Sequence, residues 1–400
     1  MDKLTKQQLL ISINDLPESD LISFVESGEI SIQEMAENGL ESRKLRSLKS
    51  HFEHSSGPAP TPDESREEVL RLCREIENNQ YNVYEIKNLI LTETISKSDL
   101  LANTTISETE YNKILLYDRQ ELDFEEWDNL PEIEPNRTDV FFFGQPGSGK
   151  SCVLGSLFYF FREKGILMEN MTNLIGTKYR NQLIDDFSYG ILPWSTAVDG
   201  INYIPIELRN LNDGTHKHPL NFVEMSGEKF REAYEKGMEH LPPKLINYLS
   251  NKNRKLLFFV VDYQIHQESS KVQMGPRQES TLPAVLELLD RFGTLGHTDA
   301  IYVLVTKSDL FPDYQTKEEH AKAFMDGPFL NFSNNLREKV LKFQNQSKFK
   351  VTVIPYSIGK IRFKDLLVEI NSESPHNVTA RIQSHSFVSR PISGWRKIFG

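Results

Sequence analysis

The residues best suited to chemistry lie at 140–154, where four apolar residues run into the pattern G-x-x-x-x-G-K-S. A strand that ends in such a loop can point backbone N–H groups at phosphate oxygens, an approach that bulky side chains would block. Lys150 would reach the β- and γ-phosphates, Ser151 would ligate Mg²⁺, and the next helix would direct its positive N-terminus at the anion. A chance glycine-rich turn is the alternative. The predicted nucleotide contacts are Gly144, Gln145, Pro146, Gly147, Ser148, Gly149, Lys150, Ser151 and Cys152.

Strands and helices alternate along residues 137–385, which we predict to form one α/β domain around this loop. Apolar, mostly β-branched or aromatic strands are expected at 140–143, 201–208, 220–223, 256–261, 301–305 and 350–354. Helices are expected at 151–164, 228–249, 282–292 and 318–343, with an added helix near 179–187 inside an insertion at 165–195. The alternation predicts a mainly parallel six-stranded sheet with helices on both faces. Ligands of such sheets bind beyond the carboxyl ends of the strands.

The first third of the chain is predicted to be helical. A helix at 19–27 precedes a capping box of Ser31 with Glu34, and Ser96 with Asp99 repeats that box 65 residues later. The repeat favours a small all-α module in two copies. We place the first copy at 1–53, a flexible Pro- and Gly-rich linker at 54–65, the second copy at 66–120, and an acidic strap at 121–136 in which Trp127 and Leu130 pack on a neighbouring surface.

Composition restricts the partners and the compartment. Residues 1–137 contain 14 Lys and Arg against 29 Asp and Glu, so this part would repel nucleic acid. A basic protein partner or solubility alone would explain the charge. No apolar run approaches the roughly 20 residues that span a bilayer, and the N-terminus lacks a secretory cleavage site. The two cysteines, Cys73 and Cys152, suit a reducing environment, so we expect a cytoplasmic protein.

Thr-Lys-Ser-Asp at 306–309, directly after an expected strand, resembles the [NT]-K-x-D motif of the Ras-like, or TRAFAC-class, P-loop GTPases. The resemblance implies that Asp309 accepts two hydrogen bonds from guanine and that Lys307 lays its stem over the base. Adenine offers no matching pair of donors there. Ser-Ile at 357–358 resembles the family's last motif, although the family usually has Ala in the second position. The guanine contacts so implied are Thr306, Lys307, Asp309, Ser357 and Ile358.

The segments between these motifs resemble the two switches of the family. Glu-Met-Ser-Gly at 224–227 stands where the family has D-x-x-G, which implies that the Gly227 N–H meets the γ-phosphate and that Glu224 holds Mg²⁺ through water. Glu228 stands where many relatives place a water-orienting Gln, and a helix-capping charge is the alternative. Thr196 would complete the Mg²⁺ shell. The implied catalytic residues are Lys150, Thr196, Gly227 and Glu228, and the implied metal residues are Ser151, Thr196 and Glu224.

Several features bear on activators and partners. Pro146 occupies the loop position at which Ras has a glycine that lets an activator's arginine approach, so we expect no Ras-type activating protein. Arg180 or Arg209 could act in cis, and the sequence selects neither. The insertion at 165–195 is an expected site of protein contacts. The tail at 386–400 mixes basic and aromatic residues, which suits an anionic membrane, a partner, or packing on the chain's own acidic third.

The resemblance covers 137–385, and the whole layout resembles bacterial GTPase-like proteins of the double-GTPase kind linked to defence systems. It implies a Mg²⁺-dependent nucleoside-triphosphate hydrolase that binds GTP and GDP as a regulatory switch, with a protein partner on the acidic helical module. Two alternatives stay open. One is a non-hydrolysing nucleotide-bound scaffold, which Glu224, Glu228 and Pro146 would permit, and the other is a P-loop ATPase. Pairing of two copies is also left open.

Overall fold

The computed structural model describes residues 62–116, 130–168, 170, 172–193, 201–226, 241–264, 278–343, 349–363, 366–386 and 388, and within the first fifty residues 16, 18–27, 29–32, 35, 40, 44, 47 and 48. The chain divides into two compact units, Met1–Cys73 and Arg74–Gly400. The boundaries of the two helical copies, the linker and the strap stay predictions.

The first unit contains helix α2 (Glu18–Glu26), which agrees with the helix predicted at 19–27. A small apolar cluster is buried in this unit and comprises Leu21, Ile30, Met35, Leu40 and Leu48. Helix α5 (Pro62–Glu77) begins within the segment predicted as linker and extends past the boundary between the units. Glu34 lies outside the described residues, and with it the predicted capping box of Ser31.

Three short helices follow α5 in the second unit: α6 (Val83–Leu91), α7 (Lys97–Asn103) and α8 (Glu108–Leu116). Helix α6 begins with a capping box in which Asn82 and Glu85 each accept the other's backbone N–H at 2.9 Å. Ser96 caps α7 as predicted, because its Oγ accepts the Asp99 N–H at 3.0 Å. Each helix also buries one apolar face, as shown by the fully buried side chains of Ile86, Leu100 and Ile114.

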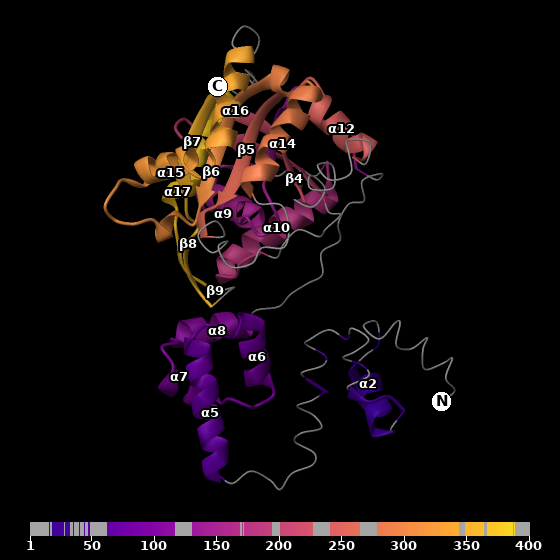
Figure 1. Cartoon of the computed structure of the whole chain (residues 1–400), viewed down its shortest axis with the longest axis vertical. Helices are drawn as coiled ribbons and strands as arrows, with labels where there is room; N and C mark the ends of the chain where they lie inside the picture. Colours follow the sequence, from indigo (N-terminus) through magenta and orange to yellow (C-terminus); the bar gives the residue numbers. More distant parts are fainter. Residues whose placement is uncertain are drawn as a thin grey trace, which may run out of the picture. The chain divides into compact units, whose positions relative to one another are not determined.

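Among the described residues, seven strands form one sheet in the order β2-β3-β4-β1-β5-β6-β7. Figure 1 labels β4, β5, β6 and β7 of this sheet. Their bounds are Thr138–Phe143 for β1, Leu167–Met168 for β2, Ile201–Arg209 for β3, Lys217–Met225 for β4, Arg254–Asp262 for β5, Thr298–Thr306 for β6 and Lys350–Tyr356 for β7. Strand β3 runs antiparallel to β2 and β4, and the remaining neighbours pair in parallel. All six predicted strands are present. The seventh, β2, has only two residues and therefore carries no periodic signal.

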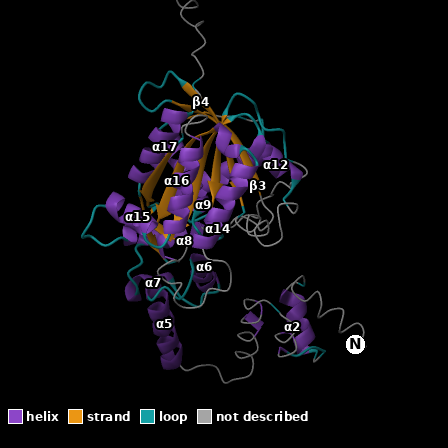
Figure 2. Ribbon diagram, turned by 45° about the horizontal axis from the view of Figure 1, so that its top comes forward, coloured by secondary structure: helices purple, strands orange, loops and turns teal. Residues whose placement is uncertain are grey.

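Apolar side chains of β1 alternate between two cores, one on each face of the sheet. Val140 and Phe142 pack with α9 (Lys150–Glu163), α10 (Leu174–Tyr189) and α17 (Glu373–His385). Phe141 and Phe143 pack with α12 (Pro243–Ser250), α14 (Gln278–Arg291), α15 (Lys317–Asp326) and α16 (Leu330–Phe343). Figure 2 shows α9, α14, α15, α16 and α17 beside the strands of the sheet. The predicted α/β arrangement with helices on both faces is confirmed.

The single helix predicted at 318–343 is wrong, because α15 ends at Asp326 and α16 begins at Leu330. Pro328 lacks the N–H that a continuous helix needs, and Gly327 has non-helical backbone angles of φ −95° and ψ −97°. The helix predicted near 179–187 is α10. Residues 241–249 of the helix predicted at 228–249 are described, and the prediction of one continuous helix there is wrong. Helix α12 begins only at Pro243, because Pro242 has an extended ψ of 136°. None of the described helices is long and apolar enough to cross a membrane.

The described part of the predicted strap, residues 130–136, packs on the domain. Leu130 is 2% exposed, which confirms its predicted burial, and its carbonyl accepts the Lys244 ammonium at 2.8 Å. The Glu134 carbonyl accepts the Asn253 amide at 2.8 Å. Trp127 lies outside the described residues. The segment is therefore anchored at the start of β1, opposite the end of β1 that leads into the glycine-rich loop.

A second sheet, which the sequence did not predict, follows β7. Strands β8 (Gly359–Arg362) and β9 (Leu366–Ile370) form an antiparallel hairpin. Strand β9 also forms a bridge between Leu366 and Ile191, and the Leu367 N–H donates to the Gly190 carbonyl at 2.6 Å. The hairpin thus joins the segment after α10 to the loop that ends β7.

Candidate functional site

The glycine-rich loop joins β1 to α9 at the carboxyl end of the sheet. Gly149 has φ +94°, in the left-handed region that favours glycine, and it precedes the first residue of α9. A Cβ on Gly144 would lie 2.6 Å from Ser148 Oγ and 2.7 Å from the Val260 carbonyl oxygen. Glycine is therefore required at 149 by the left-handed backbone angle, and at 144 by close packing against Ser148 and β5.

Lys150 lies within the loop, as predicted. It is 6% exposed, and its ammonium donates to the carbonyl oxygens of Gly144 at 2.9 Å and Gln145 at 3.1 Å. The side chain of Gln145 in turn donates to Thr281 Oγ1 of α14 at 2.7 Å. The loop thus holds a cation at the N-terminus of a 14-residue helix, which is the charge arrangement that phosphate binding needs.

Ser151 and Glu224, predicted to share a metal, lie side by side. Ser151 Oγ donates to Glu224 Oε1 at 2.6 Å, and the carboxylate is fully buried at the end of β4. The extra methylene of Glu relative to the Asp of D-x-x-G therefore does not separate the carboxylate from the serine.

Two further residues hold Glu224 that the sequence analysis missed. The Tyr179 hydroxyl of α10 donates to Glu224 Oε2 at 2.5 Å, and the Asn202 amide of β3 donates to the same oxygen at 3.3 Å. Asn202 lies directly opposite Glu224 in the β3–β4 register. Strand pairing could have indicated Asn202, whereas no local pattern places Tyr179.

The donor set fits Mg²⁺. A hydroxyl and a carboxylate are hard oxygen ligands, and Mg²⁺ typically takes one or two such protein groups together with water and substrate phosphates. Within the described residues there is no cluster of three or more His, Cys, Asp or Glu side chains that could enclose a metal by themselves. Ser151 and Glu224 would therefore hold the ion only with a phosphate ligand present.

The predicted base motif lies at the carboxyl end of β6. Lys307 has φ +59°, and its ammonium donates to Asp262 Oδ2 at the end of β5 at 2.8 Å. Thr306 Oγ1 donates to the Ser148 carbonyl at 3.1 Å, which joins this motif to the glycine-rich loop. Asp262 was missed in the sequence analysis, although its place at a strand end was a usable signal.

Asp309 faces the same cavity as the glycine-rich loop. One of its oxygens, Oδ1, accepts the Ser357 hydroxyl at 3.0 Å, so the two predicted base motifs contact each other directly. The cavity has a volume of about 600 Å³. Predicted residues on its lining are Gly147, Gly149, Cys152, Thr306, Lys307, Asp309 and Ile358. This volume is within the range of small-molecule sites, roughly 300–1,000 Å³.

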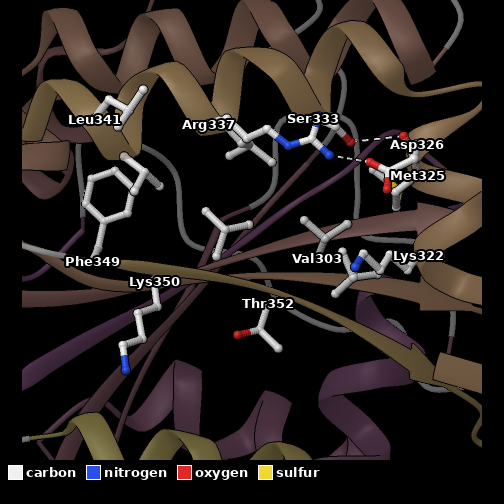
Figure 3. A pocket seen from close by; sticks show the side chains of 14 residues that line it. Val303, Lys322, Met325, Asp326, Ser333, Arg337, Leu341, Phe349, Lys350 and Thr352 are labelled. Atoms are coloured by element: carbon white, nitrogen blue, oxygen red, sulfur yellow. Dashed lines mark hydrogen bonds and ion pairs between the residues drawn. The ribbon is translucent and has the colours of Figure 1, made fainter. Parts of the chain in front are cut away.

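A second cavity, of about 630 Å³, lies between β7 and helices α15 and α16 (Figure 3). Its wall includes Leu336, Phe349 and Val353, and Arg337 spans its rim to reach Asp326 at 2.5 Å. None of the predicted site residues lines this cavity. The predicted nucleotide site is therefore the first cavity, at the carboxyl edge of the sheet.

The remaining predicted residues divide into two groups. Thr196, Gly227 and Glu228 lie outside the described residues, so their roles stay predictions.

Arg209 pairs with Lys217 at one end of β3, whereas Glu224 pairs with β3 near its other end. The two ends of a strand of this length are about 25 Å apart, so Arg209 does not reach the loop. Arg180 is buried on α10 beside Tyr179, where its guanidinium donates to Asn181 Oδ1 at 2.9 Å.

The strand order and the glycine-rich loop between β1 and α9 are consistent with a P-loop GTPase fold, in which the predicted base motif follows β6. Comparison with protein-family models and with curated proteins gives no match. Similar solved structures include the signal recognition particle receptor SRb–GTP/SRX complex from Chaetomium thermophilum, with 16% identity over 57% of this chain and 94% of that chain at a TM-score of 0.33.

Two further structures of this kind are Toc33 from Arabidopsis thaliana in complex with GDP and Mg²⁺, and the GTPase-like domain of Ski7 from S. cerevisiae bound to GDP and inorganic phosphate. Toc33 is 12% identical, over 63% of this chain and 87% of that chain, at a TM-score of 0.32. Ski7 is 14% identical, over 62% of this chain and 50% of that chain, at a TM-score of 0.30. At these values the fold assignment rests on the strand order and the loop themselves.

Proposed function

We propose that the chain binds GTP and GDP with Mg²⁺ and hydrolyses GTP as a regulatory switch. The observation that carries this proposal is the placement of the Asp309 carboxylate on the cavity that begins at the phosphate loop. A triphosphate on Lys150 would extend its purine toward Asp309. The alternative ATPase would leave that carboxylate without the paired donors that only guanine offers.

The phosphate end would act through charge and fixed donors. Lys150 and the N–H groups of the loop would offset the charge on the β- and γ-phosphates. Because Ser151 donates its proton to Glu224, the hydroxyl keeps its lone pairs for a cation, and Glu224 would hold that cation by accepting a hydrogen bond from water. Bound Mg²⁺ would supply further neutralisation of the phosphate charge.

The base end would act through an oriented carboxylate. Ser357 occupies one lone pair of Asp309 Oδ1 and so fixes the plane of the carboxylate. Asp262 similarly fixes the Lys307 ammonium, which leaves the lysine stem at the cavity wall. Both partners are held before any ligand arrives, and such preorganisation lowers the entropic cost of recognition.

Hydrolysis and switching rest on Thr196, Gly227 and Glu228. In this proposal the γ-phosphate orders the segments that carry Thr196 and Gly227, and these segments relax after hydrolysis. A protein partner would bind the acidic helical module and the insertion at 165–195. We also propose a cytoplasmic location, a link to bacterial defence, and contact of the tail with a membrane or a partner.

Nucleotide preference is tested by calorimetry of GTP, GDP and ATP on the full chain and on Asp309→Ala. We expect the full chain to prefer GTP over ATP by at least about 100-fold, and Asp309→Ala to lose most of that preference. Equal affinity for ATP and GTP would favour the ATPase.

Hydrolysis is tested by the rate of phosphate release from GTP, with Lys150→Ala as the control. A non-hydrolysing scaffold would release phosphate no faster than that variant, whereas a hydrolase would release it faster.

A further inference from the structure

The β8–β9 hairpin is a direct continuation of the predicted base loop. The Gly359 N–H donates to Ser357 Oγ at 3.3 Å, and the Asn371 N–H donates to the Ile358 carbonyl at 3.0 Å. Gly359 has φ +130°, and a Cβ there would lie 1.7 Å from the Glu369 carbonyl oxygen. The hairpin is therefore closed tightly at the point where it leaves the base-binding residues.

The far end of β8 is bound to the helical segment 74–116 through Arg362. Its guanidinium donates to Glu77 Oε1 at 3.0 Å, to Glu110 Oε1 at 3.1 Å and to the Thr105 carbonyl at 2.9 Å, and it also contacts Thr105 Oγ1. Arg362 is only 22% exposed and Glu110 only 14%. The network is thus partly shielded from water, where charge-assisted hydrogen bonds contribute more than they do on an open surface.

The carboxylates of this network are held in their charged form. Burial would raise the pKa of Glu77, but hydrogen bonds from Thr105 and the Arg362 charge outweigh it and lower the pKa. Glu110 has a lowered pKa for the same reason, with Ser107 as the backbone donor. Removal of Arg362 would therefore leave two ionised carboxylates without their cation.

Asn79, in the turn that follows α5, lies on the nucleotide cavity. Its Oδ1 accepts the Phe363 N–H at 3.2 Å, and Asn79, Ile361 and Phe363 line the same cavity as Gly149 and Asp309. Asn79 has φ +57°, a backbone conformation that Asn tolerates better than most residues. The side-chain amide of Asn79 carries two N–H groups that could donate to a ribose hydroxyl or a base edge. Asn79 belongs to neither the predicted phosphate loop nor the predicted base motifs.

We propose that the helical segment 74–116 forms the outer wall of the nucleotide cavity, with Asn79 as a nucleoside-binding residue and Arg362 as the positioning residue that holds this wall in place. The segment slows the release of bound nucleotide, because the nucleoside leaves only when the wall moves off the hairpin. Lys113 of α8 adds to the attachment through the Leu367 carbonyl at 3.5 Å. This inference rests on the proposed binding of guanine nucleotide.

The experiment measures the dissociation rate of fluorescently labelled GDP from the full chain, chased with excess unlabelled GDP. Arg362→Ala should raise the rate constant about tenfold, and Asn79→Gly, which keeps the positive φ, about threefold. Arg362→Lys should recover only part of the wild-type rate, because one ammonium cannot replace the guanidinium fork. The control is Lys360→Ala on the same hairpin, whose ion pair with Glu369 is exposed and should change the rate by less than about twofold.

The outcomes separate this inference from the proposed function. The inference is overturned if labelled GDP binds the wild type but Arg362→Ala and Asn79→Gly release it no faster than Lys360→Ala does. That result would leave the proposed function unchanged. No binding of labelled GDP or GTP to the wild type would overturn both. If Arg362→Ala fails to fold, Asn79→Gly alone decides, because Asn79 is exposed and its replacement removes one hydrogen bond, from the Phe363 N–H, but no buried side chain.

Discussion

Tyr179 of α10 donates a hydrogen bond of 2.5 Å to Glu224 Oε2, on the opposite side of the carboxylate from Ser151. The insertion at 165–195 thereby contributes directly to the residues proposed to hold Mg²⁺. A carboxylate fixed from both sides cannot rotate away from the serine, so the inserted helix positions a group of the metal site.

Tyr179→Phe should weaken the dependence of GTP affinity on Mg²⁺. Loss of one hydrogen bond to a buried carboxylate changes a binding constant by about tenfold. In this variant the lost hydrogen bond is one that orients Glu224 toward the ion. Calorimetric GTP affinity with and without Mg²⁺ measures the ratio. The matched control is Tyr189→Phe, on the exposed end of the same helix. A Mg²⁺ ratio for Tyr179→Phe equal to that of Tyr189→Phe would contradict a positioning role.

Ser357→Ala should lower the affinity for GTP and GDP by about threefold to tenfold while ATP affinity stays unchanged. The Ser357 hydroxyl orients Asp309, and a carboxylate that is free to rotate meets the two guanine donors less often. Competition of each nucleotide against labelled GDP measures the effect. Ser384→Ala, at the exposed end of α17, is the control. An equal loss for ATP and GTP would place Ser357 outside base recognition.

The parts of the site that could be predicted from the sequence are those whose residues lie close together along the chain. Gly144 to Ser151 form one loop, and neighbouring residues dictate its geometry. Asp309 could be placed because the end of a parallel strand fixes which edge of the sheet a residue occupies. The α/β fold followed from alternating apolar strands and helices for the same reason.

The parts that sequence could not give depend on contacts between distant segments. Asn79 meets Phe363 across 284 residues, and Tyr179 meets Glu224 across 45. No periodicity links such pairs, and the β8–β9 hairpin that brings Asn79 to the cavity is too short for a clear strand pattern. The split of α15 from α16 was readable from Pro328, but the apolar pattern on both sides obscured it.

Stability should depend on pH through the buried pair of Lys255 and Asp139, whose charged atoms are 3.7 Å apart. Burial lowers the pKa of Lys255 to about 8 despite the opposing carboxylate, and burial raises the pKa of Asp139. Between the folded pKa of about 8 and the unfolded value of 10.5, the unfolded chain binds more protons at Lys255 than the folded chain. The contribution of this group to the free energy of unfolding therefore rises with pH in that window.

Lys255→Met should remove this rise, so the stability of the wild type relative to the variant should increase as the pH is raised above about 8. Urea unfolding followed by circular dichroism at several pH values measures the difference. Lys252→Met, at the exposed neighbouring site, is the control and should keep the wild-type slope. Parallel pH profiles for Lys255→Met and Lys252→Met would contradict the assignment.

Gly190→Ala should destabilise the fold by about 3 kcal/mol. Gly190 ends α10 with φ +73°, and a Cβ there would lie 2.7 Å from the Leu367 carbonyl oxygen of β9. Gly165→Ala is the matched control, since Gly165 has φ +62° with no atom within 4 Å of the added Cβ. That variant should lose only about 1 kcal/mol, the cost of a left-handed alanine. The difference between the two free energies of unfolding isolates the contact of the hairpin with the segment after α10, and equal losses would show that β9 does not pack there.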